Sequence, residues 1–144
     1  MEYMIVIDHS YTNIIHNHAI STPIEIYYSD RLLELSADKI HKKDTLTVSF
    51  DVTNTGSREG AEVAQLYIRD VESSEPRPLK ELKGFSKVLV KPGETRNVAI
   101  QIDPNALSFF SSKKNKWIVE PGQFEILVGS SSKDVRLKKT FMLE

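Results

Sequence analysis

Three histidines near the N-terminus have the residue type and spacing that most directly suggest metal chemistry. His16 and His18 are two positions apart, and His9 precedes them. On a β-strand these two side chains would point to the same face, where they could bind zinc with His9 as a third ligand. A zinc site also needs further ligands and supporting hydrogen bonds, and no strand is clearly predicted here. We therefore favour surface histidines and predict that the chain binds no cofactor.

Acidic residues are numerous enough for some pair to lie at the separation that acid–base catalysis by two carboxylates requires. The chain contains 20 Asp and Glu residues, but none lies in an apolar stretch of the kind that tunes a catalytic carboxyl group. Asp51 and Glu62 occupy positions that strand alternation makes polar, which favours contact with solvent. The sequence also lacks a Gly-x-Ser-x-Gly elbow and a glycine-rich phosphate loop. We therefore predict no catalytic residues in this chain.

The composition of the chain excludes or disfavours several further classes of protein. The 144 residues have a formal net charge of −1, no cysteine and no apolar run long enough for a membrane helix. Disulfides and zinc–thiolate sites are excluded. The densest basic run, Lys113, Lys114 and Lys116, is typical of a solvated loop, so we expect neither nucleic acid nor membrane as a partner. The first residues do not resemble a secretory signal, and the cellular location stays open.

Apolar and polar residues alternate along most of the chain, which is the period of a β-strand. The run from Leu46 to Thr53 alternates without interruption, so its four apolar side chains share one buried face. Similar runs, bounded by Asn-Thr-Gly or Pro-Gly turns, cover residues 63–69, 82–90, 98–102, 117–119, 124–128 and 135–143. About seven short strands at intervals of about 8–12 residues predict an all-β sandwich. Phe50 and Ile100 should lie in its core. Lys139 interrupts the apolar face of the last strand, which predicts a bulge there or a lysine that reaches the rim.

The beginning of the chain has no comparable period. We assign residues 1–28 to an N-terminal lead-in segment and residues 29–144 to the sandwich. Residues 24–28 are compatible with a strand, and residues 36–43 are expected to form a polar connection.

Four segments resemble the fibronectin type III-like domain that ends many family 3 β-glucosidases and β-xylosidases. They are residues 44–56, 60–68, 77–85 (RPLKELKGF) and 120–124 with 128–132. They occur in that family's order, and the resemblance spans nearly four-fifths of the chain. It implies an immunoglobulin/fibronectin type III-like β-sandwich of about seven antiparallel strands. It also implies a non-catalytic role, because the family's acid and nucleophile lie in other domains.

The family's upstream domains are not part of this sequence, so we expect either an excised domain or a free-standing product. As a domain, it would stabilise or dock onto the catalytic domains of a family 3 glycoside hydrolase, or form a homo-oligomer. The alternative is a stand-alone carbohydrate- or surface-binding module.

One proline-bearing loop holds our candidates for interdomain docking: Pro76, Arg77, Pro78, Lys80 and Glu81. The prolines stiffen the loop, which lowers the entropy lost on docking. Arg77 offers a planar fork of donors, and its two charged neighbours add both signs. The equally weighted alternative is that the prolines and Arg77 only fix the crossing between the sheets.

Trp117 is the aromatic residue most open to a sugar-stacking interpretation. Aromatic residues of sandwiches more often fill the core, so we predict that Trp117 is buried. Tyr67 presents a weaker version of the same choice. Exposed, coplanar aromatic rings would favour the carbohydrate-binding alternative.

Overall fold

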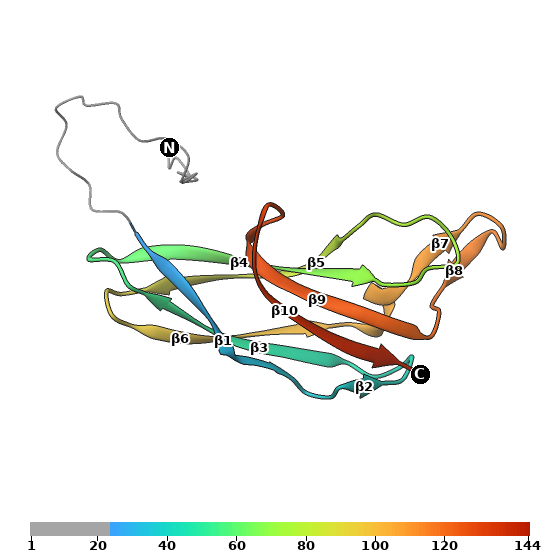
Figure 1. Ribbon diagram of the computed structural model, residues 1–144, viewed down its shortest axis with the longest axis horizontal. Coiled ribbons are helices and arrows are strands. Elements are labelled where there is room, and N and C mark those ends of the chain that lie inside the picture. Colours follow the sequence, from blue (N-terminus) through green and yellow to red (C-terminus); the bar gives the residue numbers. More distant parts are fainter. Residues whose placement is uncertain (1–23) are drawn as a thin grey trace, which may run out of the picture.

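The computed structural model describes residues 24–144. In it, the segments with alternating apolar and polar residues form two β-sheets that pack face to face (Figure 1). The strands of this part are β1 (Ile26–Leu35), β2 (Lys39–Ile40), β3 (Leu46–Asn54), β4 (Gly60–Asp70), β5 (Glu81–Val90), β6 (Thr95–Ile102), β7 (Phe109–Ser111), β8 (Lys116–Ile118), β9 (Gly122–Ser131) and β10 (Asp134–Leu143). A 3-10 helix, η1 (Pro104–Leu107), follows β6 and is capped by Asp103. The all-β prediction is confirmed, with seven long strands and three short ones in the described residues.

The strand order is that of an immunoglobulin-like sandwich. One sheet has the order β1–β3–β6 and the other β2–β10–β9–β4–β5, while β7 and β8 form a separate hairpin. Neighbours are antiparallel except β2, which runs parallel to the end of β10. The expected polar connection at residues 36–43 was therefore wrong at β2, where Ile40 is buried opposite Leu143.

The core lies between the two sheets and takes the inward face of each long strand. Alternate side chains of β3 are fully buried, and the ring of Phe50 stacks on Tyr28 with 6.0 Å between centroids. Ile100 of β6 is also buried, so both core predictions are confirmed. The facing wall consists of Ala64, Leu66, Ile68, Phe124, Ile126 and Val128.

Lys139 keeps its charge out of this core by extending sideways to β1. Its Nζ donates a hydrogen bond to the carbonyl oxygen of Leu33 at 3.3 Å. The register shifts of the β9–β10 pairing lie between Asp134 and Leu137. The bulge expected at Lys139 was wrong, and the alternative of a lysine that reaches the rim is confirmed.

The first described strand joins the segment before residue 29 to the sandwich. β1 begins at Ile26 and pairs with β3, so the expected boundary between residues 28 and 29 falls inside this strand. His9, His16 and His18 lie outside the described residues. Within residues 24–144, no group of three or more His, Asp or Glu side chains could hold a metal ion. The helical structure found in the same range includes nothing long and apolar enough to span a membrane.

We expect Phe50→Ala to lower the free energy of unfolding by about 3–5 kcal/mol, because it leaves a cavity where a fully buried ring had packed. Denaturant unfolding of the 144-residue chain measures this loss. Phe85→Ala removes an exposed ring and is the matched control, with an expected change within about 0.5 kcal/mol. Equal losses in the two variants would contradict the strand register.

Candidate functional site

The candidate docking loop and the β7–β8 hairpin meet at one end of the sandwich (Figure 1). The loop, residues 71–80, leaves β4 and enters β5, while the hairpin follows η1. Proline at the first position of η1 and the side chain of Asp103, which accepts a hydrogen bond from the backbone N–H of Asn105, fix this short helix. The docking loop and the β7–β8 hairpin, which are far apart in sequence, therefore lie against each other.

Arg77 is the buried centre of this end, with a side chain only 6% exposed. Its guanidinium donates to the Asp70 carboxylate, at 3.1 Å between Nη1 and Oδ2, and to the Glu81 carboxylate. It also lies 3.4 Å from the carbonyl oxygen of Leu107 and 4.9 Å above the ring centroid of Phe109. One cation therefore connects β4, β5, η1 and β7.

Carboxylate–serine hydrogen bonds join the loop to the hairpin. Glu75 accepts hydrogen bonds from the hydroxyls of Ser111 and Ser112, the second at 3.1 Å. Glu120 accepts from the hydroxyl of Ser74 at 2.6 Å and from its backbone N–H at 3.2 Å. The hydrogen bond from Ser111 holds the pKa of Glu75 below its usual value, and those from Ser74 do the same for the pKa of Glu120. The carboxylates are thus ionised partners at neutral pH, and they tie the middle of the loop to the β7–β8 hairpin and to the connection that follows it.

The five docking candidates differ in what they offer to a partner. Pro76 and Pro78 are exposed, whereas Arg77 points inward. Lys80 is half-buried: its Nζ donates to the carbonyl oxygen of Ser132 and lies 5.8 Å from the ring centroid of Tyr67. Glu81 is also half-buried and binds Arg77. The charged candidates all contact their own chain, and their role in docking stays a prediction.

A row of exposed apolar side chains continues from this loop along β5. We call Leu79, Leu82, Phe85 and Leu89 the apolar row; they are between 51% and 84% exposed. Several large, exposed apolar side chains in one region are typical of interaction surfaces. Our sequence analysis did not single out these four residues, although the family-like segment of residues 77–85 contains three of them.

A bulge in β5 puts Leu82 and Phe85 on the same face of the sheet. Leu82 lies opposite Tyr67 and Gly84 lies opposite Leu66, so Lys83 is an extra residue in β5. Strict alternation would place Leu82 and Phe85 on opposite faces of the sheet. The extra residue brings both to the outer face.

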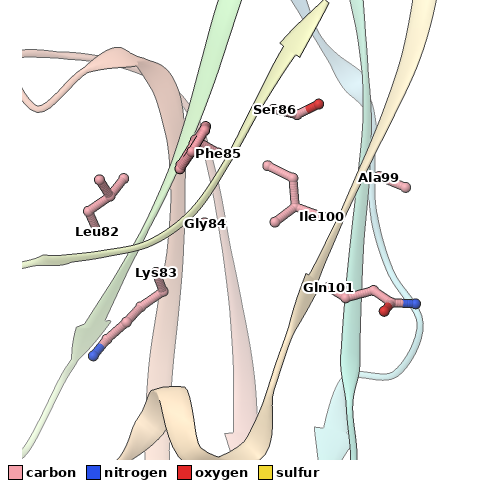
Figure 2. Close-up of a pocket in the computed structure, with 8 residues that line it drawn as sticks. All are labelled: Leu82, Lys83, Gly84, Phe85, Ser86, Ala99, Ile100 and Gln101. Atoms are coloured by element: carbon pink, nitrogen blue, oxygen red, sulfur yellow. The ribbon is translucent and has the colours of Figure 1, made fainter.

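A shallow groove separates β5 from β6, the open edges of the two sheets (Figure 2). Ile100 points from β6 toward Gly84, whereas Leu82 and Phe85 point away from β6. A Cβ atom at Gly84 would lie 2.6 Å from Cγ2 of Ile100, so only glycine allows this close approach. The groove is therefore closed at its base by packing, and the apolar row lies outside it.

Trp117 is 68% exposed, so the prediction that it is buried was wrong. It lies opposite Phe110 in the β7–β8 hairpin, and the hairpin has no second sheet against which an outward ring could pack. The two rings meet edge to face, with 5.9 Å between centroids and 75° between planes, so they are not coplanar. Tyr67, by contrast, is buried beneath Lys80, and its hydroxyl donates to Gln65.

The two carboxylates considered for catalysis both make structural contacts. Asp51 accepts a hydrogen bond from the side-chain amide of Asn97 at 2.7 Å. Glu62 accepts one from the hydroxyl of Tyr28 at 2.7 Å, and burial raises the pKa of that tyrosine, so the hydroxyl stays a donor. The first contact joins the paired strands β3 and β6, and the second joins β4 of one sheet to β1 of the other.

Known proteins that are similar to this chain match it over only a part of their own length. The model of the fibronectin type III-like domain matches residues 62–132. Thermostable beta-glucosidase B of Acetivibrio thermocellus is 44% identical over 115 residues, which are 78% of this chain and 15% of that protein. Beta-glucosidase BoGH3A of Bacteroides ovatus is 44% identical over 107 residues, which are 74% of this chain and 14% of that protein.

Solved structures show the same correspondence. A β-glucosidase from Erythrobacter marinus is similar with a TM-score of 0.77 and 36% identity, over 84% of this chain and 16% of that one. The β-glucosidase of Kluyveromyces marxianus is similar with a TM-score of 0.75 and 35% identity, over 84% of this chain and 14% of that one. This chain thus spans about a seventh of the length of the relatives that it matches. Its sandwich belongs to the fibronectin type III-like domains, and the relatives that contain the matching segment are β-glucosidases.

Proposed function

We propose that this chain is a non-catalytic domain of a family 3 β-glucosidase and that it docks onto the catalytic part of the enzyme through the apolar row. The relatives support this role because about 85% of their length lies outside the matched segment. By the family resemblance, the catalytic acid and nucleophile belong to those other domains. The role of this chain would be to stabilise the enzyme by burying surface against them.

The single observation that carries the proposal is the exposure of the apolar row. Leu79, Leu82, Phe85 and Leu89 place four large apolar side chains along one loop and one strand. Domains of one chain typically bury about 600–1,500 Å² against each other, and a few apolar or aromatic anchors supply most of the binding energy. A row of this kind fits such an interface and has no use inside the sandwich itself.

Lys87 argues against the backbone edge of β5 as the contact with the partner, because an exposed lysine on an edge strand discourages pairing with another strand. Lys87 lies on the same face as Phe85 and Leu89, whereas Lys83 is paired with Glu81 of its own chain. Lys87 also argues against a second copy as the partner. Two copies packed row against row would bring Lys87 of both into one interface, where like charges repel.

Arg77, in this proposal, supports the docking loop from inside. We expect Arg77→Ala to lower the free energy of unfolding of the 144-residue chain by about 3–5 kcal/mol, because it leaves the Asp70 carboxylate buried without its partner. Arg96→Ala is the matched control: its ion pair with Glu94 is exposed, and its loss should cost less than about 1 kcal/mol. An Arg77→Ala variant that unfolded as the wild type does in denaturant would contradict this supporting role.

A chimeric enzyme tests the docking itself. This chain replaces the matching segment of thermostable beta-glucosidase B, and the half-life of activity at high temperature is measured. We expect Leu79→Ser with Phe85→Ser to shorten that half-life by about tenfold or more, since each anchor of an interface contributes roughly 1–2 kcal/mol.

Two controls isolate the interface from the domain. The same double variant of the isolated chain should melt within a few degrees of the wild type, because both side chains are already exposed. Trp117→Ala in the chimera should leave the half-life unchanged. A double variant as heat-stable as the wild-type chimera would refute docking through the apolar row. Ultracentrifugation of the isolated chain identifies self-association, which would favour a homo-oligomer as the occupant of the row.

A further inference from the structure

Phe110 and Trp117 form a second exposed surface that the docking proposal does not use. They project from the β7–β8 hairpin, with 49% and 68% of their surface exposed. We propose that this aromatic pair binds one sugar ring of a soluble β-glucan oligosaccharide. The choice of β-linked glucose rests on the proposed function, whereas the aromatic site itself rests on the geometry of the hairpin.

The hairpin holds the pair in place before any ligand arrives. Phe110 and Trp117 lie directly opposite each other, while the neighbouring Phe109 and Ser111 are buried on the inner side. The hydroxyl of Ser111 donates to Glu75 and accepts from the backbone N–H of Lys114 at 3.0 Å. A preorganised aromatic surface loses little conformational entropy on binding.

The angle between the rings of Phe110 and Trp117 favours a soluble oligosaccharide over an insoluble polysaccharide. Coplanar rings would make a flat platform for the surface of an insoluble polysaccharide. The edge-to-face pair instead makes a non-planar surface of two exposed rings, which suits a single pyranose of a short, soluble oligosaccharide better than a flat crystalline face.

Polar groups beside the aromatic pair suit the hydroxyl rim of a sugar. Ser112, Asn115 and Lys116 are exposed in and next to the hairpin turn, and their side chains carry hydroxyl, amide and ammonium groups. The hydroxyl of Ser112 already donates to Glu75, so it can act only as an acceptor for a sugar, whereas the amide of Asn115 and the ammonium of Lys116 can donate to sugar hydroxyls.

The test exploits the fact that Trp117 is the sole tryptophan of the chain. The isolated 144-residue chain is titrated with cellotetraose and laminaritetraose, and its tryptophan fluorescence is recorded. We expect a saturable change with at least one of them, with a Kd of about 1 mM. Phe110→Ala should weaken binding by about two- to tenfold, the range expected for loss of one aromatic contact. Phe85→Ala, which removes an equally exposed ring from the apolar row, should leave binding unchanged.

Isothermal calorimetry provides the readout for Trp117→Ala, which has no tryptophan signal. We expect no binding in this variant. The proposal is overturned if neither oligosaccharide changes the wild-type fluorescence up to about 10 mM, tenfold above the expected Kd, or if Trp117→Ala binds as tightly as the wild type.

Iodide quenching in the chimeric enzyme completes the test, once the native tryptophans of the host enzyme are replaced. An accessible Trp117 agrees with a sugar site, whereas a shielded Trp117 would assign the pair to a domain interface and overturn the proposal. The outcomes for docking are separate, because they depend on Leu79 and Phe85 and not on the aromatic pair.

Discussion

The buried guanidinium of Arg77 is the interaction on which the functional end of this domain depends. A charge removed from water costs several kcal/mol unless it is paired and hydrogen-bonded. Here the pairing is supplied by Asp70 at the end of β4 and Glu81 at the start of β5, with a carbonyl oxygen of η1 and the ring of Phe109 completing the surroundings. Because the four partners come from four elements, the guanidinium makes all of these contacts only when the four elements are in place.

Because Arg77 must be paired inside the domain, its charge is not available on the outer surface of the loop. The charged side chains of the loop turn toward their own chain, and the serine–carboxylate bonds at Glu75 and Glu120 fasten it to the hairpin. What remains for a partner is apolar: Leu79 and the row along β5 on one side, and the aromatic pair of the hairpin on another. Such an end suits a domain that contacts a larger enzyme through the apolar row and leaves the aromatic pair free for a second ligand.

The sequence predicts the parts of this structure that depend on alternation. β3 and β6 are uninterrupted period-two runs, and for this reason Phe50 and Ile100 were correctly placed in the core. The fibronectin type III-like segments likewise identified the sandwich and its relatives. The sequence showed only that Lys139 interrupts the apolar face of the last strand. It could not show that the side chain donates a hydrogen bond to the carbonyl oxygen of Leu33.

The features that escaped prediction depend on three-dimensional neighbours. Trp117 lies in a three-residue strand, too short for a period to reveal which side is covered. The apolar row requires the bulge at Lys83, which reverses the expected face of Leu82. The burial of Arg77 depends on two carboxylates that a loop brings together, and for this reason the sequence left its docking and structural interpretations equally open.

Hydrogen–deuterium exchange gives the most direct test of the claim that the apolar row is a domain interface. Exchange at residues 79–89 is compared between the isolated chain and the same chain within the chimeric β-glucosidase. Docking through the row predicts markedly slower exchange of this segment in the enzyme, while residues 116–118 of β8 exchange equally in both. Equal exchange at residues 79–89 in the two settings would contradict the account, because the outer face of β5 would then be as open to solvent in the enzyme as it is alone.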